Sequence, residues 1–369
     1  MHETEWSEVV ATTTPEYLKG ASDLTIREHP VFATLEQKGK IFFNQSGTEL
    51  RWTNKFGLPD VEAYTGGAIG YEPSDKHRQL VIDWRGYRVS DMLSIKDQLM
   101  NRGAQAIIDR YSRVIPDMEQ AMRDMFAMEL YVDGTTYTDR FCGLETFMQA
   151  DTDNCLVGDI IAPPSGTYGG WNCEPGTVAG AWSASLTTKP NAHLGTDWPD
   201  GTGDTEYGFN APKLVNYGST SWGTTYTTWA KNAERALRRT TLWLGVDVGK
   251  SNKPSMYLMT QRMYYDYLQE VSTLRKIDVP ARRLIELGFD GVMQDGVELT
   301  YEYGVPEDTC YGLNLDKLEM HCMTGKLFES RGPEWDMRTA CHLFLLFTFG
   351  NWKFVSPKFF AKLYPYATQ

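Results

Sequence analysis

Two segments near the start of the chain, 41–56 and 80–89, alternate apolar with polar side chains, which is the period of a β-strand. A turn signal at Ser46 and Gly47 interrupts the first segment, and the alternation shifts at Gly86 in the second, where a bulge or bend is expected. Together the segments predict a long β-hairpin. Its apolar and aromatic positions are Ile41, Phe43, Leu50, Trp52, Phe56, Leu80, Ile82, Trp84, Tyr87 and Val89.

The stretch between the two strands, from Gly57 to Pro73, is rich in Gly and Pro and shows no helical period. A long two-stranded ribbon is marginally stable in water unless another surface covers it. That surface could belong to the same chain, but the length of the excursion favours a neighbouring chain. We therefore predict that the hairpin contacts another subunit, through Trp52, Lys55, Phe56, Tyr64 and Tyr71.

From Ser90 to Val132 the apolar positions change to the i, i+3, i+4 period of a helix. Ser90 is a suitable N-cap and Gly134 a suitable stop, whereas Pro116 must kink or divide the helix. A run of methionines in its second half would suit a promiscuous binding groove, but core packing is the commoner use of such residues. These are Met118, Met122, Met125 and Met128.

Two further segments lack any period. Residues 1–37 are acidic, with isolated aromatic residues at Trp6 and Tyr17, and form either an arm that is ordered against another surface or a frayed terminus. The pattern favours neither, and we place Trp6 and Tyr17 among the predicted intersubunit contacts. Residues 150–228 are rich in Gly, Thr, Ser and Trp, and we expect short strands and surface loops there.

The second half of the chain mixes helical and strand periods. A short basic helix is predicted from Thr228 through Arg235, Arg238 and Arg239, then a strand at 256–259 and an aromatic helix through 264–268. Alternating segments around 313–315, 318–322 and 341–349 predict further strands, punctuated by glycines. This order indicates an α+β domain with mixed strand order.

Composition narrows the function classes. The chain has 369 residues and a formal charge of −12, which argues against a basic face that reads nucleic-acid sequence but is compatible with a wall that encloses DNA. No signal peptide is visible and the apolar run 343–349 is too short to span a bilayer, so we expect a cytoplasmic site of synthesis and no membrane. The six scattered cysteines predict free thiols in a reducing compartment.

Motifs that carry chemistry are weak in this sequence. Residues 245–251 resemble a phosphate-binding loop, but the spacing is one residue short and Pro254 occupies the position of the required helix, so a surface turn is expected. The pairs at 321–322 and 341–342 each join a His to a Cys, yet neighbours on a strand face opposite ways, so core positions are the better interpretation. We predict no catalytic residue, no cofactor and no metal.

Two alternatives remain open on residue chemistry alone. The abundant Trp and Tyr would suit sugar stacking in a carbohydrate-active enzyme or lectin with carboxylates drawn from distant positions, or else they fill the core and subunit interfaces. The cluster of Arg235, Arg238 and Arg239 would suit phosphate on an inner surface, or else it is a solvated or salt-bridged helix face.

The order of short stretches along the chain resembles that in the major capsid proteins of tailed double-stranded DNA bacteriophages, which have the Hong-Kong-97-type fold. Residues 101–109 leading to 133–135 are similar to the family's spine helix and its exit, and Gly143, Leu144 and Glu145 to the segment that follows. Later landmarks are similar at 168–170 with Trp182, at 253–258, and along a path from Gly288 and Phe289 through Asp295 to Leu313 and Asn314.

The resemblance covers the chain from about residue 35 to the C-terminus and implies an α+β capsid fold in five parts. These are an N-terminal arm (1–37), an extended β-hairpin or E-loop (38–84), a peripheral domain with the spine helix and a Gly/Trp-rich insertion (85–234), an axial domain (235–340) and C-terminal strands that return to the core (341–369).

The resemblance also implies a function: a non-enzymatic subunit whose hexamers and pentamers form the icosahedral shell of a virion around double-stranded DNA, assembled in the host bacterial cytoplasm. The implied partners are a portal, decoration proteins and a separate scaffolding protein, because no long charged helical segment precedes the arm; a propeptide absent from this numbering is the alternative. Some members of the family crosslink a hairpin Lys to an Asn of a neighbour. Lys55 is suitably placed near the tip, but we identify no matching Asn.

Overall fold

The computed structural model describes residues 29–55, 65–66, 77–100, 110–149, 160–162, 164–173, 210–219, 222–223, 226–273, 279–280 and 282–365. The chain divides into two compact units. The first unit holds the described residues within 88–123 and 328–347. The second holds those within 28–87, 124–327 and 348–369.

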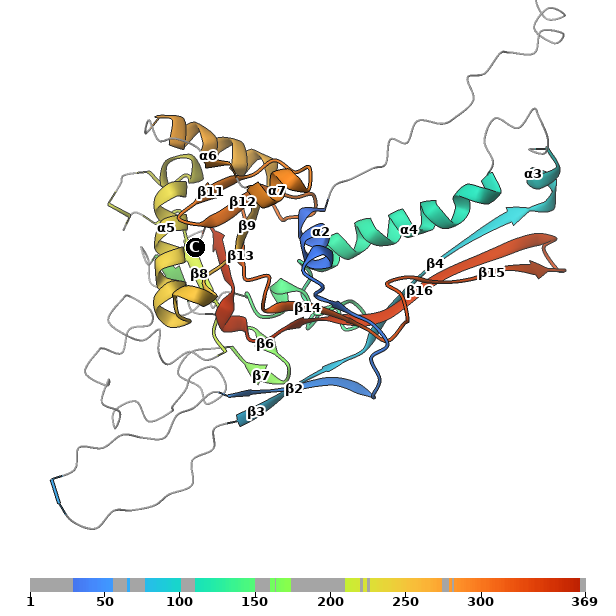
Figure 1. The fold of residues 1–369 in the computed structure, drawn as a ribbon, viewed down its shortest axis with the longest axis horizontal. Helices are drawn as coiled ribbons and strands as arrows, with labels where there is room; N and C mark the ends of the chain where they lie inside the picture. Colours follow the sequence, from blue (N-terminus) through green and yellow to red (C-terminus); the bar gives the residue numbers. More distant parts are fainter. Residues whose placement is uncertain are drawn as a thin grey trace, which may run out of the picture. The chain divides into compact units, whose positions relative to one another are not determined.

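A mixed eight-stranded sheet organises the second unit (Figure 1). β9 runs parallel to β12 and β17 parallel to β8, and the other neighbours are antiparallel. Three of its inner strands, β8, β9 and β13, are buried along their whole length, as expected for continuous apolar strands covered on both faces. The order is β10 (Val279–Pro280), β11 (Val292–Gln294), β12 (Val297–Tyr301), β9 (Met256–Met259), β13 (Cys310–Leu313), β17 (Ala361–Tyr364), β8 (Lys213–Asn216) and β5 (Ile161–Ala162).

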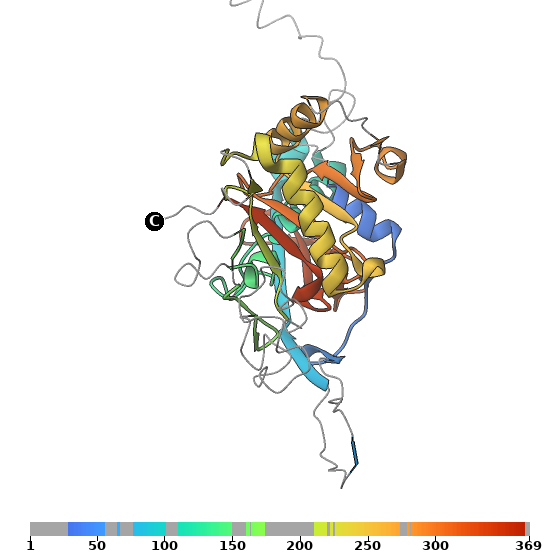
Figure 2. The same ribbon diagram turned by 90° about the vertical axis from the view of Figure 1, so that its left-hand side faces the viewer.

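Two helices pack against each other beside this sheet, α5 (Trp229–Asp247) and α6 (Gln261–Thr273), and Figure 2 shows α5 lying across the strands. Their apolar faces form one core with β9 and β12, including Trp229, Leu237, Tyr257, Met263 and Leu299. Both helices, the strand at 256–259 and the mixed strand order are therefore confirmed. The stretch 245–251 is only partly a turn, because α5 continues to Asp247 and a 3-10 turn, η6, follows (Lys250–Asn252).

A second sheet corrects part of the predicted hairpin. Strand β1 (Ile41–Phe42) runs parallel to β14 (Leu318–Cys322), with Ile41 opposite Met320. β14 in turn pairs antiparallel with the last residues of β16 (Cys341–Phe354). Residues 41–42 therefore belong to a core sheet rather than to the hairpin. The signal was ambiguous because alternation shows that a strand exists and not which strand it joins.

The hairpin itself consists of β2 (Glu49–Lys55) and β3 (His77–Asp83), which pair antiparallel with Glu49 opposite Asp83 and Lys55 opposite His77. One face carries Leu50, Leu80 and Ile82, all buried, and the other is mostly polar and exposed, apart from the half-buried Val81. This register places every predicted apolar position of the two strands on the same side. The predicted pairing is confirmed for these residues, but Tyr87 and Val89, predicted to continue the second strand, lie in a separate strand that belongs to the second sheet.

The predicted helix from Ser90 to Val132 is wrong at its start. Strand β4 (Arg85–Ser94) runs through Ser90 and pairs with β16, so Ser90 caps no helix. The helical residues are α3 (Ile95–Met100) and α4 (Arg110–Glu129), and α4 is not divided at Pro116. Strand pairing with a distant segment has overridden the local helical pattern.

Within the first unit, β15 (Glu329–Asp336) pairs antiparallel with 341–347 of β16, and its register shifts between Arg331 and Glu334. The first half of α4 belongs to the same unit, and its apolar residues lie four apart on one buried face. Of the four methionines predicted to pack in the core, Met118 and Met122 are buried, whereas Met125 and Met128 are half-buried. Other buried side chains of the unit are Leu93, Val114, Phe344 and Leu346.

Short elements complete the described residues: α2 (Pro30–Gln37), η1 (Leu144–Thr146), β6 (Thr167–Tyr168), β7 (Trp171–Asn172), α7 (Arg282–Glu286) and η7 (Pro357–Phe359). Five of the cysteines are buried free thiols, as predicted, while Cys155 lies outside the described residues. The insertion predicted at 150–228 is described only in part. The five-part division of the chain stays a prediction.

Candidate assembly surfaces

The base of the β2–β3 hairpin is fastened to its own chain by indole groups. Trp52 Nε1 donates to the Val355 carbonyl oxygen at 3.0 Å, and Trp171 Nε1 donates to the Gln79 carbonyl oxygen at 2.7 Å. Asn54 donates to the same Val355 oxygen, and the Arg78 guanidinium lies 4.5 Å from the centre of the Trp171 ring. The covering surface that a ribbon needs is thus supplied, at its base, by the same chain.

The predicted intersubunit contacts fall into two groups. Trp52 is half-buried against its own chain, and Lys55 is exposed at the end of β2. The remaining predicted contacts lie outside the described residues: Trp6, Tyr17, Phe56, Tyr64 and Tyr71. Their role in intersubunit contact, and that of Trp52 and Lys55, stays a prediction.

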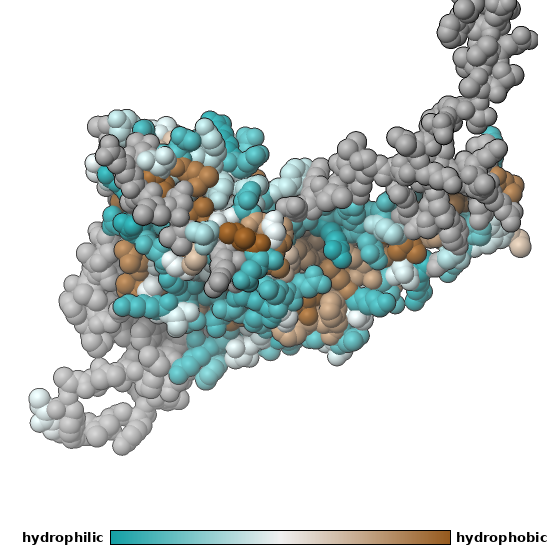
Figure 3. Space-filling view, turned by 45° about the horizontal axis from the view of Figure 1, so that its top comes forward, coloured by the Kyte–Doolittle hydropathy of each residue, from teal (hydrophilic) through white to brown (hydrophobic). Residues whose placement is uncertain are grey.

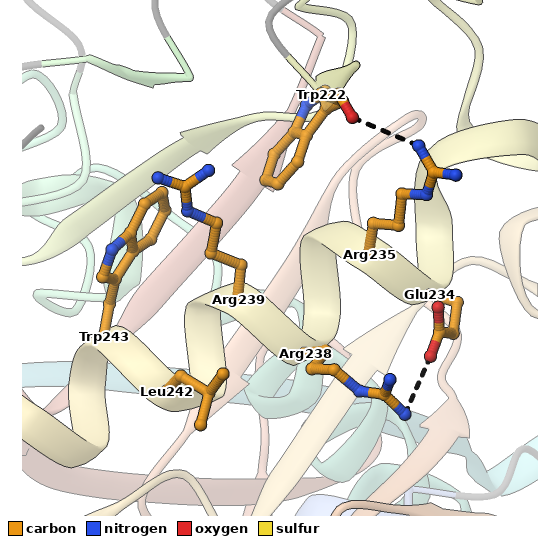
Figure 4. Close-up of a pocket in the computed structure, with 7 residues that line it drawn as sticks. All are labelled: Trp222, Glu234, Arg235, Arg238, Arg239, Leu242 and Trp243. Carbon is orange, nitrogen blue, oxygen red and sulfur yellow. Dashed lines mark hydrogen bonds and ion pairs between the residues drawn. The ribbon is translucent and has the colours of Figure 1, made fainter. Parts of the chain in front are cut away.

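The three arginines predicted on the basic helix lie on α5, in three different surroundings (Figure 4). Arg235 Nη1 donates to the Trp222 carbonyl oxygen at 3.1 Å. Arg238 forms ion pairs with Glu234, at 2.9 Å, and with Asp295, at 3.1 Å. The hydrogen bond to Asp295 raises the pKa of Arg238 further, so its charge is permanent. For Arg238 the salt-bridged interpretation is therefore the right one.

Arg239 stacks on aromatic rings, 4.5 Å from the centre of the Trp243 ring and 5.9 Å from that of Trp222. Together with Leu242 these side chains line a shallow hollow of about 540 Å³ on the surface of α5 (Figure 4). Stacking of a guanidinium on indole contributes about 0.5–1 kcal/mol at an exposed site. The placement of this helix on an inner surface stays a prediction.

A buried cluster around His29 was missed by sequence reasoning. His29 Nε2 lies 3.0 Å from Asp124 Oδ1, and its Nδ1 lies 3.6 Å from Glu302 Oε1. The Tyr131 hydroxyl donates to Glu302 at 2.7 Å. Burial opposes protonation of His29, but Glu302 and Asp124 outweigh it and leave its pKa above 6.5, while burial raises the pKa of Glu302. The cluster ties α2 to α4 and to the end of β12.

A second buried cluster closes the C-terminal end of α5. Lys213 Nζ lies 3.1 Å from Asp247 Oδ2, and Lys358 Nζ lies 2.8 Å from Asp247 Oδ1. The side chains of Lys213 and Asp247 are fully buried. Burial lowers the pKa of Lys213, and the carboxylate of Asp247 opposes this. The two cations offset both Asp247 and the negative end of the helix dipole.

A third cluster connects Glu145, one of the residues that carried the resemblance, to the large sheet. Lys362 Nζ donates to Glu145 Oε2 at 2.7 Å, and the Tyr311 hydroxyl donates to Glu145 Oε1. Glu145 lies in η1, Tyr311 in β13 and Lys362 in β17. Its role in this structure is to hold η1 against two adjacent strands.

Charged side chains also gather around Glu319. Among the described residues no group of three or more His, Cys, Asp or Glu side chains could hold a metal ion. His321 lies instead 3.2 Å from Glu319 and stacks on Phe42, and the hydrogen bonds from His321 and Lys353 lower the pKa of Glu319 to about 2. No helix among the described residues is long and apolar enough to cross a bilayer.

Comparison with known proteins identifies the fold. At the level of sequence, no protein-family model and no curated protein matches the chain. Among solved structures, the chain is similar over 100% of its length, and of theirs, to a capsid subunit of cyanophage A-1(L) (TM-score 0.61, 13% identity). The same coverage holds for a subunit of the capsid of a native GTA particle (TM-score 0.56, 10% identity).

A third similar structure is the holo-SrpI encapsulin complex of Synechococcus elongatus. The aligned region covers 100% of this chain and 99% of the encapsulin chain (TM-score 0.50, 9% identity). The predicted Hong-Kong-97-type α+β fold is therefore confirmed at the level of the whole chain. At these identities the likeness concerns the path of the backbone and does not extend to individual side chains.

Proposed function

We propose that this protein is the major capsid protein of a tailed bacteriophage and builds the icosahedral head shell that encloses the double-stranded DNA genome. The observation that carries the proposal is the end-to-end structural match to capsid subunits, with full coverage of both chains. A shell subunit needs surfaces that only neighbours cover. The exposed polar side chains of the β2–β3 hairpin support this proposal. So do several exposed apolar side chains, and Figure 3 shows apolar areas on one face of the molecule.

The proposed mechanism is burial of modest areas repeated over many equivalent interfaces, so that weak single contacts add up to a stable shell. Hexamers and pentamers of the chain would form the shell, with a separate scaffolding protein, a portal and decoration proteins as partners. Assembly would take place in the host bacterial cytoplasm. The acidic composition supports a wall that encloses DNA without gripping it.

The role is structural rather than enzymatic. The similarity to capsid subunits does not favour the carbohydrate-binding alternative. Trp222 and Trp243 line the hollow on α5, but three other tryptophans of the described residues are engaged within the chain. Trp352 is fully buried, Trp229 donates to the Met263 carbonyl oxygen at 2.8 Å, and Trp52 donates to Val355. Each of these three indole groups is therefore occupied by packing or hydrogen bonding within the chain.

The decisive experiment is the size of the purified protein, measured by light scattering and negative-stain electron microscopy. Closed shells of uniform diameter are expected, alone or after co-expression with its scaffold. Nuclease-resistant DNA in particles from infected cells would separate a phage head from a shell with protein cargo, which matters because an encapsulin shares the fold. Stable monomers under all conditions would overturn the proposal.

A second experiment deletes residues 57–75, the predicted hairpin tip. If the tip contacts a neighbour, the deletion abolishes shells while the soluble subunit keeps its circular-dichroism spectrum and cooperative unfolding. The base is expected to survive, because Trp52 and Trp171 hold it to the rest of the chain. A deletion that unfolds the subunit would show that the tip belongs to its own core.

A further inference from the structure

One face of α5 is exposed along three turns of the helix, except at Arg239, which is half-buried. Arg235, Arg239, Leu242 and Val246 follow one another at intervals of three or four residues and therefore share one side, which we call the α5 stripe. Leu242 is 63% and Val246 74% exposed. The opposite side of the helix, including Leu237 and Leu244, is fully buried. The stripe is basic in its first half and apolar in its second.

The basic half of the stripe lacks a carboxylate. Arg238, beside the stripe, is paired with Glu234 and Asp295. Among the described residues, Arg235 binds a backbone oxygen and Arg239 stacks on indole rings, and neither forms an ion pair with a carboxylate. A surface that matches the stripe would therefore offer carboxylates beside an aromatic or apolar side chain.

The loop between β12 and β13 offers this combination. Tyr303 is 51% exposed, Glu307 and Asp308 are exposed, and no Lys or Arg occurs between Glu302 and Asp316. The loop is well supported: the Tyr217 hydroxyl donates to the Asp308 carbonyl oxygen at 3.0 Å, and Gly304 packs against Met128 with little room for a side chain. A loop held in this way loses little entropy on binding.

The stripe and the loop belong to the same unit, and residues of both are exposed there. Within one copy, therefore, the stripe and the loop do not cover each other. We propose that the α5 stripe binds the β12–β13 loop of a second copy of this chain, with Glu307 and Asp308 against Arg235 and Arg239, and Tyr303 against Leu242. This inference rests on the proposed shell function. A contact between two different surfaces is heterologous, and such a contact closes into a ring when the rotation allows it.

Disulfide trapping tests this contact directly. The variant that combines Leu242→Cys with Tyr303→Cys should form, under mild oxidation, a ladder of dimers, trimers and larger species on a non-reducing gel. Neither single variant should go beyond dimers, because a heterologous contact needs both positions. The matched control combines Leu242→Cys with Tyr265→Cys, since Tyr265 is 61% exposed but lies on α6. The five described native cysteines are buried, and the parent protein gives the background.

Charge reversal provides the second arm. In the double-cysteine variant, Arg239→Glu should slow crosslinking about tenfold at low salt and less at high salt, and Glu307→Arg should restore part of the rate. Shells without a ladder would overturn this inference and leave the proposed function standing. A ladder without shells would support the contact between copies and count against the proposed shell function. An unchanged rate with Arg239→Glu would also overturn the inference.

Discussion

Helix α5 carries ion pairs in two contrasting surroundings. At its C-terminal end, Asp247 meets Lys213 and Lys358, and the side chains of Asp247 and Lys213 are out of contact with water. Midway along the helix, Arg238 meets Glu234 and Asp295 while its own side chain stays 49% exposed. The distances are similar, between 2.8 and 3.1 Å. Judged by these distances alone, the ion pairs of the two sites would be expected to contribute equally to stability.

Burial is what separates them. An exposed pair replaces favourable contacts with water and is screened by salt, so its net contribution is small. A buried pair contributes little in comparison with an apolar pair, but loss of one partner strands the other charge in a medium of low dielectric constant. The sensitivity of a charged site to mutation should therefore follow the exposure of the partner left behind.

The largest effect is expected from Asp247→Ala. This change leaves Lys213 buried without its carboxylate, and we expect a loss of about 3–5 kcal/mol in the free energy of unfolding, measured by denaturant titration of the unassembled subunit. The double variant Lys213→Met with Asp247→Leu removes both charges and serves as the control. It should be much closer to the parent protein. A single variant as stable as the double one would contradict the comparison.

The His29 cluster is the next site in order of effect. His29→Gln removes the cation between Asp124 and Glu302, and we expect a loss of about 1–3 kcal/mol near pH 6. Because the pKa of His29 is raised in the folded protein, its contribution is fully present below pH 6.5 and is lost as pH rises through the folded value. The parent protein should therefore lose stability from pH 6 to pH 8.

The pH dependence also supplies the control for this prediction. In the His29→Gln variant the unfolding free energy should change less between pH 6 and pH 8 than in the parent protein. The raised pKa of Glu302 acts in the same direction, beginning at its usual 4.5. Equal slopes for variant and parent would show that His29 does not titrate in this range.

Local sequence patterns correctly predicted those elements whose secondary structure does not depend on a partner strand far away in the sequence. The alternation at Leu50, Leu80 and Ile82 predicted the hairpin, because one covered face imposes the period by itself. Alternation misassigned Ile41, which joins Met320, and the helical period misassigned Ser90, which lies in a strand paired with β16, because in each case the partner is hundreds of residues away in sequence. The same limit hid the ion clusters. His29 and Glu302 carry no local signature, and only the fold brings them together.

A smaller effect is expected at the hairpin base. Trp52→Phe keeps most of the apolar surface but removes the hydrogen bond to the Val355 oxygen, which still accepts from Asn54. We expect a loss of about 1 kcal/mol in the free energy of unfolding. Thr53→Ala, on the exposed face of the same strand, should stay within about 0.5 kcal/mol of the parent protein. A loss at Thr53 equal to that at Trp52 would mean that the strand and not the indole is responsible.

The smallest effect is expected from Arg238→Ala, the exposed counterpart of Asp247→Ala on the same helix. Neither carboxylate that it leaves without a partner is as buried as Lys213: the Asp295 side chain is 40% exposed and that of Glu234 is 9% exposed, against 0% for Lys213. We expect a loss of about 0.2–1 kcal/mol that shrinks further in 1 M salt, measured by the same denaturant titration. A loss above about 2 kcal/mol, unchanged by salt, would show that proximity and not burial decides how much a charged pair on α5 contributes.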